Sequence, residues 1–301
     1  MRTLCFGEAI VDLICRRPVS SLAEADAFVP SPGGVAANVA AVAAQHGAAV
    51  ALAGGAGDDA WGGWLRDRLA AAGVQLTWFG LAATQATAVA FVTLDERGEP
   101  AWQLYGDGVA AALAALDGRL LDAVEATDAF FFTSNTLAGK AEAELTMAAR
   151  DRALQLGRPI VFDPNLRLHR WRANPGRAGK LAGACVPGAF LVKCNQAEAR
   201  LMTGETEPEA AAASLLAAGA RHVIVTRGAG GAILRGKGMR VDARSSPAKV
   251  LRSTVGAGDA FLGVLIARLG ATDYYPSALA AALPEAAAEA ARACERWGAL
   301  E

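Results

Sequence analysis

The glycine-rich segment STVGAGDAF, which begins at Ser253, carries the strongest chemical signal in this sequence. Gly256, Ala257 and Gly258 lead directly into an apolar stretch that predicts a helix. Glycines let the backbone come close to an anion, and the start of a helix presents unpaired N–H groups with a partial positive charge. These three residues therefore form a candidate anion hole of phosphate size.

Asp259 falls in the first turn of that predicted helix, beside the candidate anion hole. A carboxylate in this place can simply cap the helix. It can also accept the proton of a hydroxyl that attacks a phosphoryl group, which is what phosphoryl transfer to an alcohol requires. The segment by itself leaves both interpretations open.

A second glycine pair precedes another predicted helix, in SPGGVAANVA at residues 31–40. This pattern is typical of a tight strand-to-helix turn with an asparagine on the helix surface. It also predicts a hydroxyl-binding face, because Gly33 and Gly34 would expose backbone and the Asn38 amide can both donate and accept. We place Asp12 at the end of the first predicted strand, where ligands bind in open α/β sheets, and its carboxylate could hold two neighbouring hydroxyls.

The composition favours a globular protein. The chain has 301 residues and a net charge of -1, with 53% hydrophobic and 20% charged residues, which is not typical of a disordered chain or of a general nucleic-acid binder. We find no apolar run of about 20 residues, so the sequence predicts no membrane-spanning helix. Glu8 and Asp12 interrupt the apolar start, which argues against a signal peptide.

The cysteine and histidine residues argue against several other classes. The five cysteines lack CxxC spacing, so we expect reduced thiols and a cytoplasmic location. The three histidines form no HExxH motif, which argues against a histidine-rich zinc site. A GxSxG hydrolase motif is also missing from the sequence.

Strands and helices alternate along most of the chain. The pattern predicts a strand over residues 3–14, a helix ending at Gly47, a short strand, and a helix over 59–72. Such alternation indicates a parallel sheet covered by helices on both faces. It resumes after Val109 with the buried strands DAFFFTS, RPIVFDP, AFLVKC and RHVIVTRG, and with predicted helices over 138–156, 174–184 and 208–219.

Residues 75–105 break this alternation. They contain the strand-like runs VQLTWFGL, ATAVAFVTL and PAWQLYG, and no helix lies between them. Strands without intervening helices cannot form a βαβ series, so we expect a small antiparallel sheet that projects from the main domain. The predicted organisation is a core of residues 1–14, 33–74 and 107–301, and a projecting sheet of residues 15–32 and 75–106.

The two glycine motifs, in this order and at this separation, resemble the signatures of the PfkB (ribokinase-like) carbohydrate kinases, and the resemblance covers nearly the whole chain. GGVAANVA is similar to the first signature and TVGAGDAF to the second. The resemblance implies an α/β fold, a ribokinase-like three-layer αβα sandwich with a mainly parallel sheet and a small antiparallel β lid. It also implies ATP-dependent phosphorylation of a sugar hydroxyl, with Asp259 as base and residues 256–258 as the anion hole.

Further segments extend the resemblance. KCNQAEARLMTG is similar to the family's NxxE segment, which implies nucleotide contacts from Lys193 and Asn195, and a magnesium ion held through water by Asn195 and Glu198. An N-cap asparagine followed by a first-turn glutamate is also a common structural pairing. VIVTRGAGG resembles the strand and turn that contact the nucleotide, although a glycine-rich hairpin would look the same. The candidates there are Thr226, Gly228 and Gly231.

FDPNLRLHRW and the opening FGEAIVDLI resemble the fructokinase and 2-keto-3-deoxygluconate kinase branch. The resemblance implies that Asn165 and Arg167 approach the sugar or the transferred phosphate; a surface ion pair is the alternative for Arg167. The family's lids also often pair between subunits, which together with the apolar run AVAFVTL implies a homodimer through the lid.

The sequence departs from the family pattern at two places. Ser253 stands where the family usually has an aspartate that helps to hold a monovalent cation, which counts against potassium activation. Tyr105 is followed by Gly106 and Asp107, whereas acidic-sugar kinases tend to carry an arginine after the tyrosine. Without that arginine, the carboxylate of an acidic sugar loses a natural partner. We therefore expect a small neutral sugar as substrate, with fructose favoured.

The sequence also allows three other functions to be considered. The first is a catalytically weak or inactive sugar- or nucleotide-binding protein of the same fold. The second, a dinucleotide-dependent oxidoreductase, would need GxGxxG after the first strand, where this chain has Glu8 and Asp12 instead. The third is a P-loop nucleotide site at GAILRGKG, residues 231–238, which nearly matches a Walker A loop. Gly238 replaces the hydroxyl residue of that loop, and the segment predicts a hairpin instead. We expect ATP and a small sugar as partners, and neither nucleic acid nor a membrane.

Overall fold

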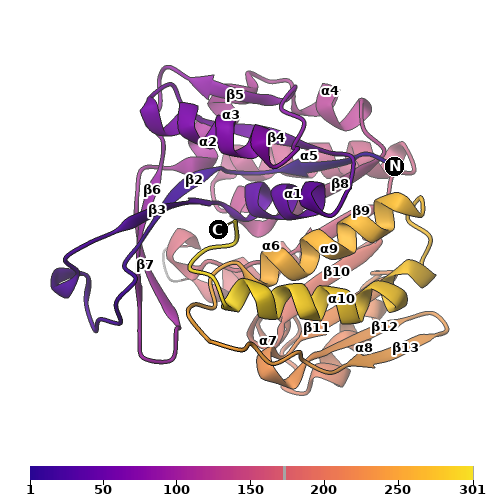
Figure 1. Cartoon of the computed structure of the whole chain (residues 1–301). Helices are drawn as coiled ribbons and strands as arrows, with labels where there is room; N and C mark the ends of the chain where they lie inside the picture. Colours follow the sequence, from indigo (N-terminus) through magenta and orange to yellow (C-terminus); the bar gives the residue numbers. More distant parts are fainter. Residues whose placement is uncertain (172–173, 301) are drawn as a thin grey trace.

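The computed structural model describes residues 1–171 and 174–300, and within them a large sheet forms the middle layer of the protein (Figure 1). Its strands lie in the order β13-β12-β11-β10-β9-β8-β1-β4-β5, and those from β11 to β5 are parallel to one another. The strands are β1 Thr3–Phe6, β4 Val50–Gly57, β5 Phe79–Ala82, β8 Ala129–Thr133, β9 Ile160–Asp163, β10 Leu191–Asn195, β11 His222–Thr226, β12 Ala232–Gly236 and β13 Met239–Ala243.

Helices cover both faces of this sheet, because its strands are apolar on both sides. In β1, Cys5 belongs to the core cluster on one face, whereas Leu4 and Phe6 belong to the cluster on the other. The first face is covered by α1 Val35–Gln45, α2 Ala60–Ala71, α9 Ala257–Ala271 and α10 Ser277–Cys294. The second is covered by α3 Gly108–Leu116, α4 Leu120–Glu125, α5 Lys140–Gln155, α6 Pro175–Ala184, α7 Gln196–Thr203 and α8 Pro208–Ala217. The predicted three-layer αβα sandwich is confirmed.

Helices α1 and α9 pack closely because the residues between them are small. Helix α1 is buried from Val35 to Ala43 and consists largely of alanine. At Gly263 of α9, an added Cβ would lie 2.7 Å from the Cβ of Val42 in α1, so only glycine permits this approach. The close contact brings the side chains on the first turns of the two helices together.

A second, smaller sheet forms the lid, with the order β3-β2-β6-β7 (Figure 1). Its strands are β2 Ile10–Ile14, β3 Val29–Gly33, β6 Val89–Leu94 and β7 Pro100–Tyr105. The β2–β3 and β6–β7 pairs are antiparallel, and β2–β6 is parallel. Pro30 and Pro32 lie in the edge strand β3, where a missing backbone N–H is tolerated.

The single strand predicted over residues 3–14 is wrong. The chain leaves the large sheet after Phe6 and enters the lid sheet at Ile10, so β2 belongs to the lid rather than to the core segment 1–14. Gly7 makes this break possible with a φ of +153°, and a Cβ there would lie 2.8 Å from the Cβ of Ala36. Asp12 therefore lies within a lid strand, and Glu8 takes the position at the carboxyl end of β1.

The lower boundary of the predicted lid segment 75–106 is also wrong. Strand β5 at residues 79–82 pairs in parallel with β4 in the large sheet. Helix α2 lies between these two strands, so β4, α2 and β5 form the βαβ crossover that parallel pairing requires. The part of this segment in the lid sheet begins with β6. The predicted core segment also includes residues 172–173 and 301, which lie outside the described residues.

Helices and hairpins elsewhere follow the sequence pattern. The predicted helices 59–72, 138–156, 174–184 and 208–219 correspond to α2, α5, α6 and α8. The segment that nearly matches a Walker A loop forms the antiparallel hairpin of β12 and β13, with Lys237 and Gly238 in its turn. The prediction of a hairpin there is confirmed.

Candidate active site

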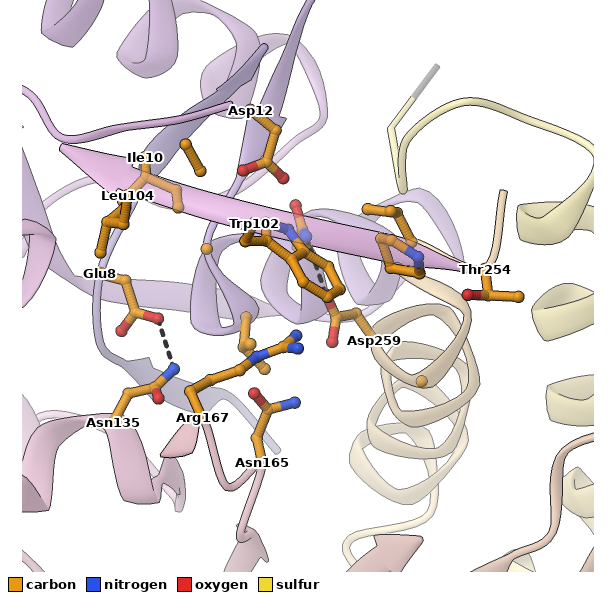
Figure 2. A pocket seen from close by; sticks show the side chains of 18 of the residues that line it. Glu8, Ile10, Asp12, Trp102, Leu104, Asn135, Asn165, Arg167, Thr254 and Asp259 are labelled. Carbon is orange, nitrogen blue, oxygen red and sulfur yellow. Dashed lines mark hydrogen bonds between the residues drawn. The ribbon is translucent and has the colours of Figure 1, made fainter. Parts of the chain in front are cut away.

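A cavity of about 480 Å³ lies at the carboxyl ends of the large-sheet strands, where the lid covers them (Figure 2). The lid contributes Ile10, Asp12, Ala90, Trp102 and Leu104 to its wall. The core contributes polar side chains from strands β10 and β11, from the segments that follow other parallel strands, and from the first turns of α1, α7 and α9. These are Glu8, Asn38, Asn135, Asn165, Arg167, Lys193, Asn195, Glu198, Thr226 and Asp259.

The start of helix α9 forms one side of this cavity. Gly256 is the N-cap residue with a left-handed φ of +77°, and no side chain caps the helix. Gly256 and Gly258 line the cavity, while Ala257 is the first helical residue between them. A Cβ at Gly258 would lie 3.2 Å from the ammonium of Lys193, so a lysine stands beside the helix start. Both features favour an anion at this point.

Asp259 is held at the helix start by Asn38. The Nδ2 of Asn38 donates to the Oδ2 of Asp259 over 2.8 Å, and both residues are buried. Burial raises the pKa of Asp259 to about 6, and the Asn38 bond and the charges of Arg167 and Lys193 oppose this shift. A carboxylate with a pKa near neutrality is suited to accept a proton from an alcohol.

Asp12 faces the same cavity from the lid strand β2 (Figure 2). A Cβ at Gly33 would lie 2.4 Å from its Oδ2, so the glycine leaves the space that this carboxylate occupies. Burial raises the pKa of Asp12 to about 7, Arg167 opposes the shift, and the nearby carboxylates of Asp259 and Glu8 add to it. Gly34 lines the cavity directly.

Arg167 points into the middle of the cavity, between these carboxylates (Figure 2). Burial raises the pKa values of Glu8, Asp12 and Asp259, and the positive charge of Arg167 opposes this shift in all three. The guanidinium carbon lies 4.6 Å from the ring centre of Trp102, which reaches it from the lid strand β7. This cation–π contact links the lid to the core across the cavity.

Another part of the cavity wall, beside the start of α9, contains charges that are paired. The ammonium of Lys193 donates to Asp163 over 2.8 Å, and both side chains are almost fully buried. Glu198 accepts one backbone N–H at each oxygen, from Leu166 at 3.1 Å and from Asn195 at 2.8 Å. Burial and the charge of Asp163 raise the pKa of Glu198, and Lys193 opposes them. The capping box predicted as the structural alternative for Asn195 and Glu198 is present.

The predicted nucleotide-contact residues divide between the cavity and the sheet. Thr226 and Gly228 line the cavity at the end of β11. Gly231 does not: an added Cβ would lie 2.0 Å from the carbonyl oxygen of Ala243, so this glycine allows β12 and β13 to meet closely. Its φ of +83° and its packing explain a glycine there without any ligand.

Comparison with known proteins identifies the family of this chain. Residues 2–299 match the family described as pfkB family carbohydrate kinase. This chain belongs to that family. It is 31% identical over 265 residues to fructokinase-2 of Solanum lycopersicum, which covers 88% of this chain and 80% of that protein. It is 30% identical to the probable fructokinase-4 of Arabidopsis thaliana, over 88% of this chain and 81% of that protein.

Solved structures of sugar kinases share the fold. The fructokinase of Vibrio cholerae O395 has a TM-score of 0.86 at 26% identity, covering 99% of this chain and 94% of that chain. The fructokinase of Xylella fastidiosa has a TM-score of 0.82 at 28% identity, with the same coverage. The protein is therefore a carbohydrate kinase with the ribokinase-like architecture.

The sequence analysis missed several residues of this kinase's cavity. Glu8 and Asn135 follow β1 and β8, and Trp102 lies in β7. Asp163, within the FDPN segment, pairs with Lys193. Glu8 and Asp163 each follow an apolar run that predicts a buried strand, which was a usable signal. Trp102 gave none, because an aromatic residue in a lid strand is indistinguishable from a core residue.

At both places where the sequence departs from the family pattern, the side chains have partners within the fold. Ser253 is fully buried, and its hydroxyl accepts the backbone N–H of Val255 over 3.0 Å. Asp107 caps helix α3 and also pairs with Arg170 at 3.2 Å. Arg170 lines the cavity, but its charge is already balanced by Asp107 and by Glu142 at 3.6 Å.

None of the helices in residues 1–171 and 174–300 is long and apolar enough to cross a membrane.

Proposed function

We propose that this kinase transfers the γ-phosphate of ATP to a hydroxyl of a small neutral sugar, with fructose as the favoured substrate. The observation that carries the proposal is the buried Asp259 carboxylate, held by Asn38 at an uncapped helix start within a covered cavity. The fructokinase relatives favour fructose, and the Vibrio cholerae fructokinase structure is described as containing fructose and ADP.

The sugar would bind at the lid end of the cavity. Asp12, Asn38 and Asn165 each have a side-chain oxygen that lacks a hydrogen-bond partner within the described residues. Sugar hydroxyls are donors, so they suit these acceptors. Gly34 lines the cavity beside them, and Gly33 would act by leaving room for the Asp12 carboxylate. A neutral sugar avoids placing a further anion beside Asp12 and Glu8, with Arg167 as the nearest free counter-charge.

The reaction would proceed at the start of α9. Asp259 accepts the proton of the attacking hydroxyl while oxygen bonds to the γ-phosphorus and the bond to the ADP oxygen breaks. The backbone at Gly256, Ala257 and Gly258, together with the Lys193 ammonium, stabilises the negative charge of the transferred group. The lid, with Trp102 over Arg167, keeps water from competing with the sugar.

ATP would lie along the β10 and β11 side of the cavity, with Lys193, Asn195, Thr226 and Gly228 as contacts. A contact from Gly231 stays a prediction, since packing against Ala243 already explains a glycine there. The Xylella fastidiosa fructokinase structure is described with bound ATP.

The residues present fit a magnesium ion held through water. Glu198 lines the cavity, and each of its oxygens keeps a free lone pair after accepting one backbone N–H. Magnesium keeps several of its waters, so a site with few protein ligands, Glu198 and Asn195, is suitable. When bound, the ion would neutralise charge on the ATP phosphates. A Vibrio cholerae fructokinase structure contains calcium. Because Ser253 replaces the usual aspartate, we expect no strong activation by potassium.

The test is a coupled ADP-release assay over a panel of neutral sugars, sugar acids and nucleosides. We expect turnover with fructose, and a kcat about 10²–10⁴ lower in Asp259→Asn, the usual contribution of a general base. Calorimetry should show that the variant still binds sugar and ATP. Asp122→Asn is the matched control, because Asp122 also lies in the first turn of a helix but is exposed and outside the cavity.

Two results would contradict the proposal. Near-normal turnover in Asp259→Asn would remove this residue from the reaction. Binding of sugar and ATP by the wild type without turnover on any sugar would indicate the inactive sugar-binding alternative instead.

The outer face of the lid supports a homodimer. Tyr105 is 52% exposed, and its ring contacts Phe91, which in turn contacts Phe28. Together they form an aromatic surface on the face of the lid sheet opposite Asp12. We expect a dimer mass in light scattering at micromolar concentration, and a monomer would contradict this part of the proposal.

A further inference from the structure

Glu8 and Asn135 form a polar pair at the carboxyl ends of two neighbouring strands. Glu8 follows β1 and Asn135 follows β8, and these strands pair in parallel with Phe6 opposite Phe132. The side chains therefore meet at one edge of the sheet, where the Nδ2 of Asn135 donates to the Oε1 of Glu8 over 2.8 Å (Figure 2). The reaction proposed above assigns no task to either residue.

Each member of this pair has an acceptor without a donor. The Oε2 of Glu8 and the Oδ1 of Asn135 are buried and have no hydrogen-bond partner within residues 1–171 and 174–300. Both residues line the cavity and are at most 7% exposed. A buried polar atom without a partner costs about 1–3 kcal/mol, so this pair is suited to a ligand that supplies N–H or O–H donors.

The chain packs closely around the start of the Glu8 side chain. A Cβ at Gly34 would lie 2.4 Å from the carbonyl oxygen of Glu8, and a Cβ at Gly108 would lie 3.2 Å from the Cβ of Glu8. Glycine at both positions therefore leaves room for Glu8, which lies in the cavity wall and is 7% exposed.

The surroundings of the pair disfavour an anionic ligand group. Burial raises the pKa of Glu8, and the charges of Arg170 and Arg167 lower it, which opposes its protonation. Arg170 is already balanced by Asp107 and Glu142. On the lid side, Ile10 and Leu104 add apolar surface (Figure 2). A carboxylate or phosphate placed here would lie beside the Glu8 carboxylate, and the positive charge of Arg167 already offsets those of Asp12 and Asp259.

We propose that Glu8 and Asn135 form a specificity subsite, which binds a sugar hydroxyl other than the one that is phosphorylated. The subsite selects polyhydroxyl substrates and rejects those that carry a carboxylate or phosphate at that position. This inference rests on the sugar-kinase function proposed above and assigns the pair to substrate selection, with no part in proton transfer.

The experiment measures kcat/KM for fructose and for its monodeoxy analogues in the wild type and in Glu8→Gln. In the wild type, removing the contacted hydroxyl should lower kcat/KM about ten- to hundredfold, the range for a hydrogen bond to a charged group. In Glu8→Gln that penalty should fall below about threefold, while KM for fructose rises about tenfold and kcat changes less than about threefold. Glu8→Ala and Asn135→Ala repeat the comparison if the first variant folds poorly, as judged by thermal melting.

Glu289→Gln serves as the matched control. Glu289 is also 7% exposed, but it pairs with Arg292 and Arg296 and does not line the cavity. This variant should keep the wild-type pattern of deoxy-sugar penalties. If Glu8→Gln keeps that pattern too, the pair only orders a water or the loop, and the subsite is overturned. If instead the wild type phosphorylates no neutral sugar, the proposed function itself fails, which is a different result.

Discussion

Two sets of residues that line or adjoin the cavity differ in how their buried polar groups are satisfied. In the first set, which we call the paired end, Lys193 and Asp163 form an ion pair of 2.8 Å, and Glu198 accepts a backbone N–H at each oxygen. In the second set, which we call the open end, each residue has a buried side-chain oxygen without a partner in the described residues; these are Glu8, Asp12, Asn38, Asn135 and Asn165.

The difference separates side chains whose charge is already balanced within the fold from side chains whose acceptors remain open for a ligand. A buried charge whose partner is present holds neighbouring strands and loops in one arrangement. An unpartnered buried acceptor lowers stability, and proteins retain such groups where function requires them. The four predictions that follow test this comparison.

The largest effect is expected from breaking the paired end. Lys193→Met leaves the buried carboxylate of Asp163 without its counter-charge, which should lower the free energy of unfolding by about 3–5 kcal/mol. Urea denaturation measures this loss. The double variant Lys193→Met/Asp163→Leu should recover much of it, because no charge is then left unpaired. Equal stability of the single variant and the wild type would show that the pair does not hold the structure.

At the open end, Asp12→Asn should make the protein more stable and weaken sugar binding. The folded pKa of Asp12 is raised to about 7, so the fold prefers its protonated form. That preference is fully present below about pH 4 and becomes a loss of stability as the pH rises through 7. The substitution should therefore raise the free energy of unfolding by on the order of 3 kcal/mol at pH 8.

Denaturation at about pH 3 is the internal control for this variant, because there the carboxyl group is mostly protonated in both the folded and the unfolded state. We expect almost no gain in stability at that pH. A gain of the same size at about pH 3, or a loss at pH 8, would contradict the assignment of Asp12 to the open end.

Asn38→Ala sharpens the comparison, because Asn38 is the residue of the open end that stabilises the catalytic carboxylate. Burial raises the pKa of Asp259 to about 6 and the Asn38 bond lowers it, so losing that bond should raise the pKa by about one unit. A base acts when deprotonated, so kcat/KM should fall below about pH 6 in the wild type and below about pH 7 in the variant. The pH profile measures this shift, and Asn174→Ala, which removes a helix N-cap on α6, should leave it unchanged.

The smallest effect is expected at the contact that joins lid and core. Trp102→Ala removes the ring from above Arg167, a contact worth about 0.5–2 kcal/mol. KM for the sugar should rise less than about tenfold, and ATP hydrolysis without sugar should increase because the lid excludes water less well. Trp102→Phe should lie between this variant and the wild type.

Trp61→Ala is the control for Trp102, since Trp61 is 37% exposed against 36% for Trp102 but lies on α2 outside the cavity. An unchanged KM and unchanged ATP hydrolysis in Trp102→Ala would remove the lid contact from the mechanism.

The sequence predicted the parts of the site that depend on neighbouring residues. A glycine turn before an apolar run identifies the start of α9, because both the turn and the helix are local properties. Asp12 was placed in the cavity for the wrong reason: it lies in a lid strand, and the break at Gly7 that sends it there depends on the contact with Ala36. The nucleotide contact of Gly231 stays a prediction, because the sequence cannot separate a glycine that meets a phosphate from one that meets a strand, and the structure shows close packing against β13 there.

By itself the sequence determined the alternation of strands and helices over most of the chain and the residues at the two glycine turns, because periodicity and turn chemistry act over a few residues along the chain. The resemblance of its two glycine motifs to the family signatures indicated the sugar-kinase family. Only the tertiary structure decided which carboxylates have partners. Lys193 pairs with Asp163, which lies 30 residues away along the chain, and Glu8 with Asn135, which lies 127 residues away. Burial and pairing depend on those long-range contacts, and they distinguish the paired end of the cavity from the open one.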